Sequence, residues 1–381
     1  MTPDPALVEA VRRRVAASGS PPTGAGVAAA LRDEGAGLRG DAAAVLAALS
    51  SEIVGSGPLA PLLADPLVTD CLVNGPREVW VDRGDGLVLT GVRFADDTAV
   101  RRLAQRLVAP TGRRLDDAQP WVDAVLADGT RLHALLPPLS QGGTCLSLRV
   151  PRRRVFTVPE LVAARTVPPD GAQLLLGLVE ARVAFLVTGG TGTGKTTLLS
   201  ALLSLVGPTE RLLLVEDASE LQPDAGHVVR LQARPPNVEG AGAVTLQDLV
   251  RQALRMRPDR VVVGECRGAE VVDLLAALNT GHEGGCGTLH ANSAVDVPAR
   301  LEALAALAGL GREALHSQVA AALRVAVHLT RRDGVRRVAQ VCVLQRDDTG
   351  WVRAAPAWTW NGVAPAGVAG PAAGALSALL S

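Results

Sequence analysis

A glycine-rich stretch at residues 185–197, FLVTGGTGTGKTT, carries residue types that bind phosphate. An apolar run, then glycines, then a second apolar segment predict a strand, a loop and a helix. Residues 189–196 fit G-x-x-x-x-G-K-[ST], in which backbone N–H groups and a helix N-terminus face phosphate oxygens. The pattern predicts that Lys195 reaches the β- and γ-phosphates of ATP and that the Thr196 hydroxyl ligates Mg²⁺. The nucleotide-binding residues predicted in this way are Gly189, Gly190, Thr191, Gly192, Thr193, Gly194, Lys195, Thr196 and Thr197.

Lys195 is the only lysine among the 38 basic residues of the chain. A preference for arginine codons explains the abundance of arginine elsewhere, but it does not explain this one exception. A compact, rotatable ammonium group at the phosphates is not replaceable by a planar guanidinium group. The exception therefore favours a phosphate-binding loop over the alternative, a glycine-rich turn without a ligand.

Two acidic residues follow apolar runs that predict buried strands. Residues 261–265 (VVVGE) end at Glu265, and residues 213–217 (LLVED) contain Glu216. Hydrolysis of a nucleoside triphosphate needs one acidic group that holds Mg²⁺ through water and another that polarises the attacking water. Ligands gather at the carboxyl ends of strands in open α/β sheets, so both acids are expected beside one nucleotide. In the alternative, each acid only caps a helix or lies on the surface.

A loop of small residues at 280–292 contains His282 and His290. His290 precedes Ala-Asn-Ser in this loop, which favours a role as a sensor of the γ-phosphate. No spacing of His, Cys and Asp indicates a metal site apart from nucleotide-bound Mg²⁺. Four further histidines are interpreted as structural: His133, His227, His316 and His328.

Composition argues against several classes of protein. The formal net charge is zero and tyrosine is absent, so we expect no direct binding of nucleic acid, which needs a basic surface or aromatic stacking. Five cysteines without a C-x-x-C pair suit a reducing cytoplasm and exclude a cysteine-based zinc site. No apolar run reaches the roughly 18–20 residues of a membrane span, and no export signal begins the chain. We therefore expect an intracellular protein without a transmembrane segment.

Apolar periodicity and turn residues divide the chain into five segments. Short strands with one helix predict a small α+β domain, and buried strands that alternate with helices predict an α/β domain with a parallel sheet covered on both faces. The first 20 residues fit a helical lead-in or a mobile amphipathic arm equally well. The predicted segments are a helical lead-in (1–55), the α+β domain (56–155), a hinge (156–168), the α/β domain (169–361) and a disordered tail of Ala, Gly and Pro (362–381).

Within these domains the patterns predict individual elements. The smaller domain is expected to contain strands at 68–73, 78–81, 87–92 and 144–150, a helix at 96–108 capped by Asp96, and a hairpin over 121–136. The larger domain is expected to contain strands at 183–188, 212–216, 260–264, 325–329 and 337–344, and helices at 173–180, 245–255, 271–278 and 299–307.

Residues 57–345 resemble the ATPase superfamily of type II and type IV secretion systems, and in particular its Tad (Flp) pilus-assembly ATPases. The tetracysteine zinc motif of the type II branch is absent here, which points away from that branch. The segments that carry the resemblance are GPLAPLLADP at 57–66, VNGP at 73–76, the acidic box EDASEL at 216–221, RPPNVEG at 234–240, the Walker B-like LRMRPDRVVVGECR at 254–267 and the histidine box at 280–292.

The resemblance implies a RecA-like phosphate-loop ATPase domain, a PAS-like N-terminal domain and a homohexameric ring. It implies that Glu216 activates the attacking water and that Glu265 lies on the Mg²⁺ side, through water. Arg131 and Arg149 resemble arginines that face the nucleotide of a neighbouring subunit, and Arg113 is a third candidate. The implied partners are inner-membrane platform proteins of a pilus or secretion system, which would place this protein at the inner face of the cytoplasmic membrane.

Three functions stay open at this point. The first is an oligomeric ATPase motor that powers pilus assembly or protein secretion. The second is a motor for conjugation or DNA transfer, which the resemblance allows although zero net charge disfavours direct contact with DNA. The third is a nucleotide-gated scaffold without catalysis, which would require Glu216 or Glu265 to be misplaced.

Overall fold

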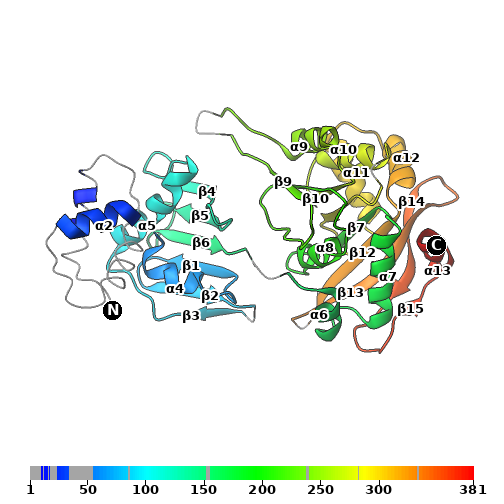
Figure 1. The fold of residues 1–381 in the computed structure, drawn as a ribbon, viewed down its shortest axis with the longest axis horizontal. Helices are drawn as coiled ribbons and strands as arrows, with labels where there is room; N and C mark the ends of the chain where they lie inside the picture. The colour runs from blue at the N-terminus through cyan, green and yellow to red at the C-terminus, as the bar shows by residue number, and fades with distance from the viewer. Residues whose placement is uncertain are drawn as a thin grey trace. The chain divides into compact units, whose positions relative to one another are not determined.

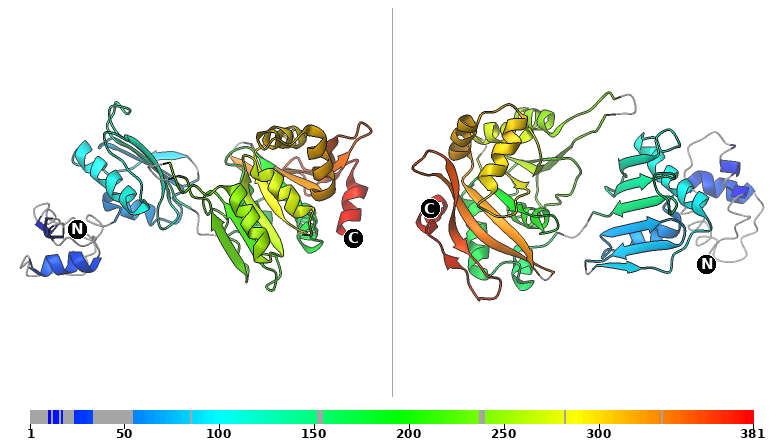
Figure 2. Two further views of the ribbon diagram at one scale, coloured as in Figure 1. Left: turned by 90° about the horizontal axis from the view of Figure 1, so that it is seen from above. Right: turned by 180° about the vertical axis from the view of Figure 1, so that it is seen from behind.

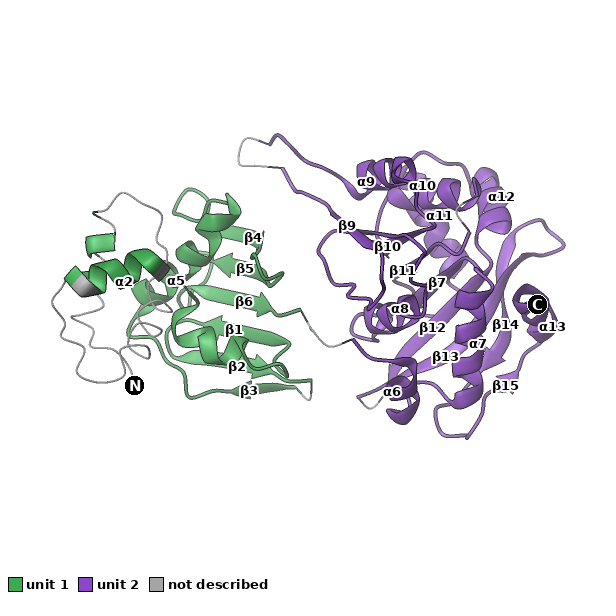
Figure 3. Ribbon diagram, viewed as in Figure 1, with its two compact units in different colours: residues 1–152 green, residues 153–381 purple. Residues whose placement is uncertain are grey.

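The chain forms two compact units, residues 1–152 and 153–381 (Figure 3). The computed structural model describes residues 10–11, 13–15, 17, 24–33, 55–84, 86–151, 155–236, 240–281, 283–332 and 334–381. Most of the predicted helical lead-in lies outside these residues, although helix α2 (Gly24–Asp33) is described within it. In the described parts of the chain, no helix has both the length and the apolar character needed to cross a membrane.

Unit 1 is built on a six-stranded antiparallel sheet with the order β3-β2-β1-β6-β5-β4 (Figure 1). Alternate residues such as Cys71, Val73 and Leu132 are buried in a core with α5, as the two-residue period of a strand requires. This is the predicted α+β architecture, including the hairpin of β4 and β5. Its elements are η1 (Gly57–Leu59), α4 (Ala60–Leu63), β1 (Asp70–Asn74), β2 (Glu78–Asp82), β3 (Leu87–Leu89), α5 (Asp97–Val108), η2 (Ala109–Thr111), β4 (Trp121–Val125), β5 (Arg131–Leu135) and β6 (Cys145–Arg149).

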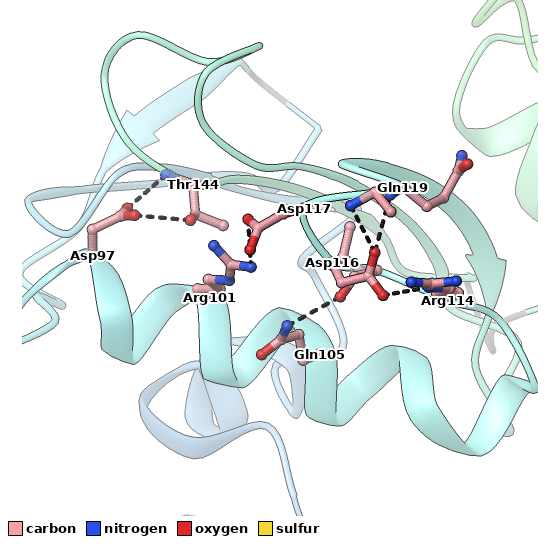
Figure 4. A network of polar contacts seen from close by, with 10 residues as sticks. Asp97, Arg101, Gln105, Arg114, Asp116, Asp117, Gln119 and Thr144 are labelled. Atoms are coloured by element: carbon pink, nitrogen blue, oxygen red, sulfur yellow. Dashed lines mark hydrogen bonds and ion pairs between the residues drawn. The ribbon is translucent and has the colours of Figure 1, made fainter.

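Carboxylates fix helix α5 to the loops around it. Asp96 caps the helix, as predicted, by accepting the N–H of Ala99 at 2.7 Å. Asp97 accepts hydrogen bonds from the backbone N–H and the hydroxyl of Thr144, the residue before β6 (Figure 4). Arg101 pairs with Asp117 in the loop that leads to β4. These contacts hold the ends of β4 and β6 in place beside the helix.

Unit 2 contains a nine-stranded sheet with the order β15-β14-β13-β12-β7-β11-β10-β8-β9. The six strands from β12 to β9 run parallel, and β13, β14 and β15 extend the sheet antiparallel. The predicted parallel sheet is therefore confirmed for six strands only. The strands are β7 (Phe185–Gly189), β8 (Leu212–Glu216), β9 (Val228–Gln232), β10 (Arg260–Cys266), β11 (Cys286–Leu289), β12 (Val325–Arg332), β13 (Val335–Arg346), β14 (Val352–Thr359) and β15 (Val368–Ala369).

Helices cover both faces of this sheet (Figure 2). Successive residues of a strand point to opposite faces, so Val187 lies in a core with α6, α7 and α8, whereas Leu186 lies in a second core with α9 to α12. The predicted two-sided coverage is therefore confirmed. The helices are α6 (Val158–Ala163), α7 (Pro169–Glu180), α8 (Lys195–Leu203), α9 (Leu246–Ala253), η3 (Leu254–Met256), α10 (Glu270–Leu278), α11 (Val297–Leu307), α12 (Arg312–Ala322) and α13 (Ala373–Leu380).

The structure differs from the predicted hinge over residues 156–168. Thr157 and Glu160 form a capping box that begins α6, in which each side chain accepts the backbone N–H of the other residue. Val158, Leu161 and Val167 are buried in the core of unit 2. This segment is therefore part of unit 2, because a capped helix with buried apolar residues is packed rather than a linker.

The structure also differs from the predicted disordered tail over residues 362–381. Strand β15 pairs with β14, and α13 contacts α7 with Leu376 buried at 2% exposure. A Cβ atom at Gly370 would lie 2.3 Å from the carbonyl oxygen of Pro356 in β14, so this glycine lets the tail approach the strand closely. The Ala- and Gly-rich composition serves close packing here instead of disorder.

Replacing Leu376 with alanine is expected to lower the free energy of unfolding of unit 2 by roughly 2 kcal/mol or more, because a buried leucine leaves a cavity. Urea unfolding monitored by tryptophan fluorescence measures the change. Ser377→Ala, one residue along the same helix and exposed, is the control and should shift stability by less than about 0.5 kcal/mol. Equal stability of the two variants would contradict the packed tail and support the predicted disorder of residues 362–381.

Candidate functional site

The phosphate loop connects β7 to α8 in unit 2 (Figure 1). Gly192 and Gly194 have φ angles of 72° and 93°, a left-handed conformation that a side chain would strain. A Cβ atom at Gly189 would lie 2.5 Å from the carbonyl oxygen of Leu329, so only glycine fits there. Gly194 is the N-cap of α8, where the first backbone N–H groups of the helix have no partner inside the helix. The backbone therefore has the shape of an anion-binding loop.

Lys195 begins α8 and is buried, with 7% exposure. Its Nζ donates to the carbonyl oxygens of Gly189 at 3.1 Å and Gly190 at 3.0 Å, and lies 3.3 Å from Nε2 of His290. Burial lowers the pKa of Lys195, and the negative charge of Glu265 opposes this shift. The carbonyl groups of the loop therefore hold the ammonium group of Lys195, the one lysine of the chain, against the loop itself.

Glu265 lies near the carboxyl end of β10, where the register to β11 shifts between Val263 and Cys266. Such an irregularity re-aims a side chain. Oε1 of Glu265 lies 2.5 Å from Nε2 of His290, and Oε2 pairs with Arg267. Burial and then the charge of Lys195 lower the pKa of His290. Lys195, His290 and Glu265 thus meet at one place, although 95 residues separate the lysine from the histidine.

Glu216 is the last residue of β8 and is 4% exposed. Its Oε1 accepts the backbone N–H groups of Glu220 at 2.9 Å and Leu221 at 2.8 Å. A Cβ atom at Gly264 of neighbouring β10 would lie 2.7 Å from Cγ of Glu216, so that glycine makes room for the acid. Burial raises the pKa of Glu216 to about 7 despite the two hydrogen bonds. A carboxyl group with this pKa is suited to proton transfer at neutral pH.

The side chains at the loop fit a magnesium-bound nucleotide. The Thr196 hydroxyl and the Glu265 carboxylate offer the oxygen ligands that Mg²⁺ prefers, and Oε1 of Glu265 is buried without an aligned hydrogen-bond donor in the described part of the chain. Thr193 donates to the carbonyl oxygen of Gly190 at 2.9 Å, which closes the loop on itself. Thr191 and Thr197 lie on either side, in the loop and in the first turn of α8. Bound Mg²⁺ neutralises charge on the phosphate oxygens.

The three predicted arginines all lie in unit 1, whereas the phosphate loop lies in unit 2. Arg131 of β5 and Arg149 of β6 are direct neighbours in the sheet register. The register therefore places both side chains on one face of the sheet. Arg113 lies outside the sheet, after η2.

Sequence reasoning missed two contacts near the site, one at Glu265 and one at the end of β7. Arg267 pairs with Glu265, and this contact raises the pKa of the guanidinium group. His328, interpreted as structural, lies 3.0 Å through Nδ1 from the hydroxyl of Thr188, the residue before the loop. Arg267 could have been found from its place beside Glu265 in the motif, whereas the position of His328 depends on β12 pairing with β7. His282 lies outside the described residues.

Residues 52–355 match the family model described as type II/IV secretion system protein. The chain belongs to this family. The match covers most of both units, including the phosphate loop, Glu216, Glu265 and His290.

Relatives of this type II/IV secretion system protein carry names from DNA transfer and from secretion. A protein of Mycobacterium tuberculosis strain H37Rv, provisionally named for conjugal transfer, is 58% identical over 320 residues, which cover 82% of this chain and 91% of the relative. The type IV secretion system protein PtlH of Bordetella pertussis is 34% identical over 266 residues, which cover 62% of this chain and 76% of the relative.

Among solved structures, the pilus retraction motor PilT with bound ADP is similar in fold, with a TM-score of 0.55 and 20% identity over 77% of this chain and 84% of that one. DotB of Yersinia pseudotuberculosis matches with a TM-score of 0.51 and 16% identity over 78% of this chain and 76% of that one. The fold is therefore the predicted α/β fold with a RecA-like phosphate-loop unit.

Proposed function

We propose that this protein is an ATP-hydrolysing, oligomeric motor that powers pilus assembly or protein secretion at the inner face of the cytoplasmic membrane. The observation that carries the proposal is the meeting of Lys195, His290 and Glu265 at a phosphate loop whose glycines have the required conformation. A scaffold without catalysis would not need a buried acid such as Glu216 at the end of β8, next to β10, whose burial raises its pKa to about 7. Membership of the secretion family supports the same function.

Each predicted site residue has a place in this proposal. The phosphate loop and Lys195 bind the phosphates of ATP, and Thr196 and Glu265 hold Mg²⁺, the glutamate through water. Glu216 accepts a proton from the attacking water. His290, in contact with both Lys195 and Glu265, senses the γ-phosphate. Arg131 and Arg149 act on the nucleotide of a neighbouring subunit in a homohexamer.

The experiment that tests this function measures ATP hydrolysis by the purified full chain, together with its mass by size-exclusion chromatography and light scattering in Mg-ATP. Turnover in a species of ring size supports the motor. A monomer that binds ATP and never hydrolyses it, with and without membranes that contain the platform proteins, would favour the nucleotide-gated scaffold.

Arg131→Ala is expected to lower kcat at least about tenfold and to change the Kd for ATP by less than about threefold, because an arginine supplied by a neighbouring subunit stabilises charge in the transition state. Arg102→Ala, an exposed arginine of α5 in the same unit, is the control and should leave both values unchanged. An equal loss of affinity and kcat would place Arg131 in folding or in binding by its own subunit.

A second candidate function is supported by the provisional name of the Mycobacterium tuberculosis relative, which describes conjugal transfer. In this case the same motor would act during DNA transfer. Titration of the protein with labelled single- and double-stranded DNA at several salt concentrations tests for direct contact. Binding that weakens steeply with salt would favour this function, because contacts with phosphates release counterions.

A further inference from the structure

The β12–β13 hairpin lies beside the phosphate loop, and neither its position nor its arginines belong to the motif. Strand β12 pairs in parallel with β7, with Leu329 opposite Gly189. It then continues to Arg332, and β13 returns from Val335. The register places Arg331 of β12 directly opposite Arg336 of β13. The hairpin thus brings one arginine from each of its two strands to the level of the loop.

The hairpin touches the loop at its two left-handed glycines. Nε of Arg336 donates to the carbonyl oxygen of Gly192 at 2.9 Å. A Cβ atom at Gly194 would lie 3.2 Å from Cδ of Arg336, and a Cβ atom at Gly192 would lie 3.6 Å from Nη1 of Arg331. The absence of a side chain at Gly194 therefore leaves room for Arg336, whereas the distance from Gly192 to Arg331 is that of an ordinary contact.

The hydrogen bond to the Gly192 carbonyl also affects the backbone N–H of Thr193, a group that can donate to phosphate. The peptide unit is planar and trans, so the carbonyl oxygen of Gly192 and the N–H of Thr193 belong to one rigid plane and point in opposite directions. A hydrogen bond that holds this oxygen therefore also sets the direction of the N–H of Thr193. Glycine-rich loops otherwise spend conformational entropy when they order around a ligand. Fixing one plane in advance reduces this cost.

The register also places two arginines opposite each other on this hairpin. Arg331 and Arg336 occupy opposite positions of an antiparallel pair, where like charges are unfavourable. Arg332, next to them in sequence, is exposed and lies opposite Val335. The arginine pair therefore lies at the part of the hairpin that contacts the loop.

We propose that Arg336 is a positioning residue for nucleotide binding, which holds the carbonyl of Gly192 so that the N–H of Thr193 faces the phosphates. This role rests on the proposed function, because it serves the same phosphate loop. It differs from the role of Lys195, which reaches the phosphates itself, because Arg336 acts through the backbone.

Three variants separate the hydrogen bond from the charge. In glutamine the amide nitrogen is bonded to Cδ, as Nε is in arginine, so Arg336→Gln keeps a donor at the same position without the charge. Arg336→Met keeps the bulk of the side chain and removes donor and charge. Arg332→Met, on the same hairpin, is the matched control. The readouts are the Kd for ADP, measured with a fluorescent ADP analogue and by competition with ADP, and the KM and kcat for ATP, with thermal unfolding as a check of folding.

We expect Arg336→Met to raise the Kd for ADP and the KM for ATP about tenfold, because it removes a hydrogen bond with a charged donor. The value of kcat should change by less than about twofold, because the loop binds ground state and transition state alike. Arg336→Gln should stay within about threefold of the wild type, because a neutral donor remains. Arg332→Met should match the wild type.

Equal losses in Arg336→Gln and Arg336→Met would overturn the proposal in favour of charge alone, and a match between Arg336→Met and Arg332→Met would overturn it altogether. If Arg336→Met does not fold, Arg336→Lys replaces it, because lysine keeps the charge and moves the donor. Tighter binding of ADP by Arg336→Lys than by Arg336→Gln would contradict the proposal. Binding of ADP does not require hydrolysis, so a wild-type protein that binds ADP without turnover leaves this test valid and counts only against the motor.

Discussion

Lys195→Ala is expected to lower ATP turnover at least about a hundredfold, the loss seen when one donor to a developing negative charge is removed. The Nζ of Lys195 lies at the mouth of the phosphate loop, between the loop carbonyls and His290. Its removal also takes away a charge that interacts with Glu265 and, in the proposed function, a direct contact to phosphate. Steady-state hydrolysis of ATP and the Kd for ATP measure both effects, and thermal unfolding shows that the variant is folded.

Lys195→Arg is the informative control for this prediction. All other Lys or Arg positions of the chain are arginines. If arginine at position 195 also supported turnover, the single lysine would have no chemical explanation. We expect Lys195→Arg to be nearly as inactive as Lys195→Ala, because a planar guanidinium group does not fit the pocket of a compact ammonium. The pocket is tight, since Lys195 is 7% exposed. Activity near that of the wild type would contradict the argument from composition.

The elements that hold the site were predictable because their signals are local. Strand β7, the loop and α8 follow from one short segment, in which apolar residues, glycines and Lys195 occur in order. Strand β8 ends at Glu216 and β10 carries Glu265 one residue before its end, and parallel strands bring such ends to one edge of the sheet. Glu216 and Glu265 were therefore expected near the phosphates before their contacts were visible.

What could not be predicted depends on contacts between distant segments. Strand β14 contains Pro356 and several alanines, so it lacks the alternation of a strand, yet it pairs with β13 along its length. Trp358 of this strand packs where a Cβ atom at Gly171 or Gly367 would come within 2.7 Å or 2.1 Å of its ring. Composition indicated disorder for residues 362–381, because small residues supply little apolar area of their own. These small residues stabilise the fold by letting the tail pack closely on β14, and no local sequence pattern shows this packing.

The same distinction applies to the site. The histidine box pointed to His290, but its contact with Lys195 and Glu265 depends on the order of β7, β11 and β10 in the sheet. Arg336 gave no signal, because the β12–β13 hairpin reaches the loop only through the pairing of β12 with β7. Sequence motifs thus predict the groups that would contact phosphate, whereas the residues that contact those groups become visible only in the folded structure.

Glu216→Gln is expected to lower kcat at least about a hundredfold, because an amide cannot accept the proton of the attacking water. The Kd for ATP should change little, since the side chain lies on β8, outside the phosphate loop, and is held by the N–H groups of Glu220 and Leu221. An amide oxygen accepts these hydrogen bonds as well. Single-turnover hydrolysis with bound ATP separates the lost chemical step from binding.

The pKa of Glu216 adds a dependence on pH that distinguishes a base from a structural acid. Burial raises this pKa from its ordinary value of 4.5 to about 7. Since the essential base must be ionised in the free enzyme, kcat/KM should rise with pH and level off above an apparent pKa of about 7. The rise should vanish in Glu216→Gln. A flat profile in the wild type would exclude Glu216 as the base.

Stability should change with pH in the opposite direction. A carboxyl group whose pKa is raised on folding contributes stability that is fully present below its unfolded pKa and lost as pH rises through its folded pKa. Glu216 therefore costs stability at pH 8, where it carries a buried charge, and costs none at pH 4. Glu216→Gln should unfold at a higher temperature than the wild type at pH 8 and at the same temperature near pH 4, whereas Glu180→Gln, an exposed control on α7, should match the wild type at both. If Glu216→Gln gains stability at pH 8 and loses turnover, the ionised acid lowers stability and is required for catalysis. If the variant loses turnover and stability together, Glu216 has a structural role.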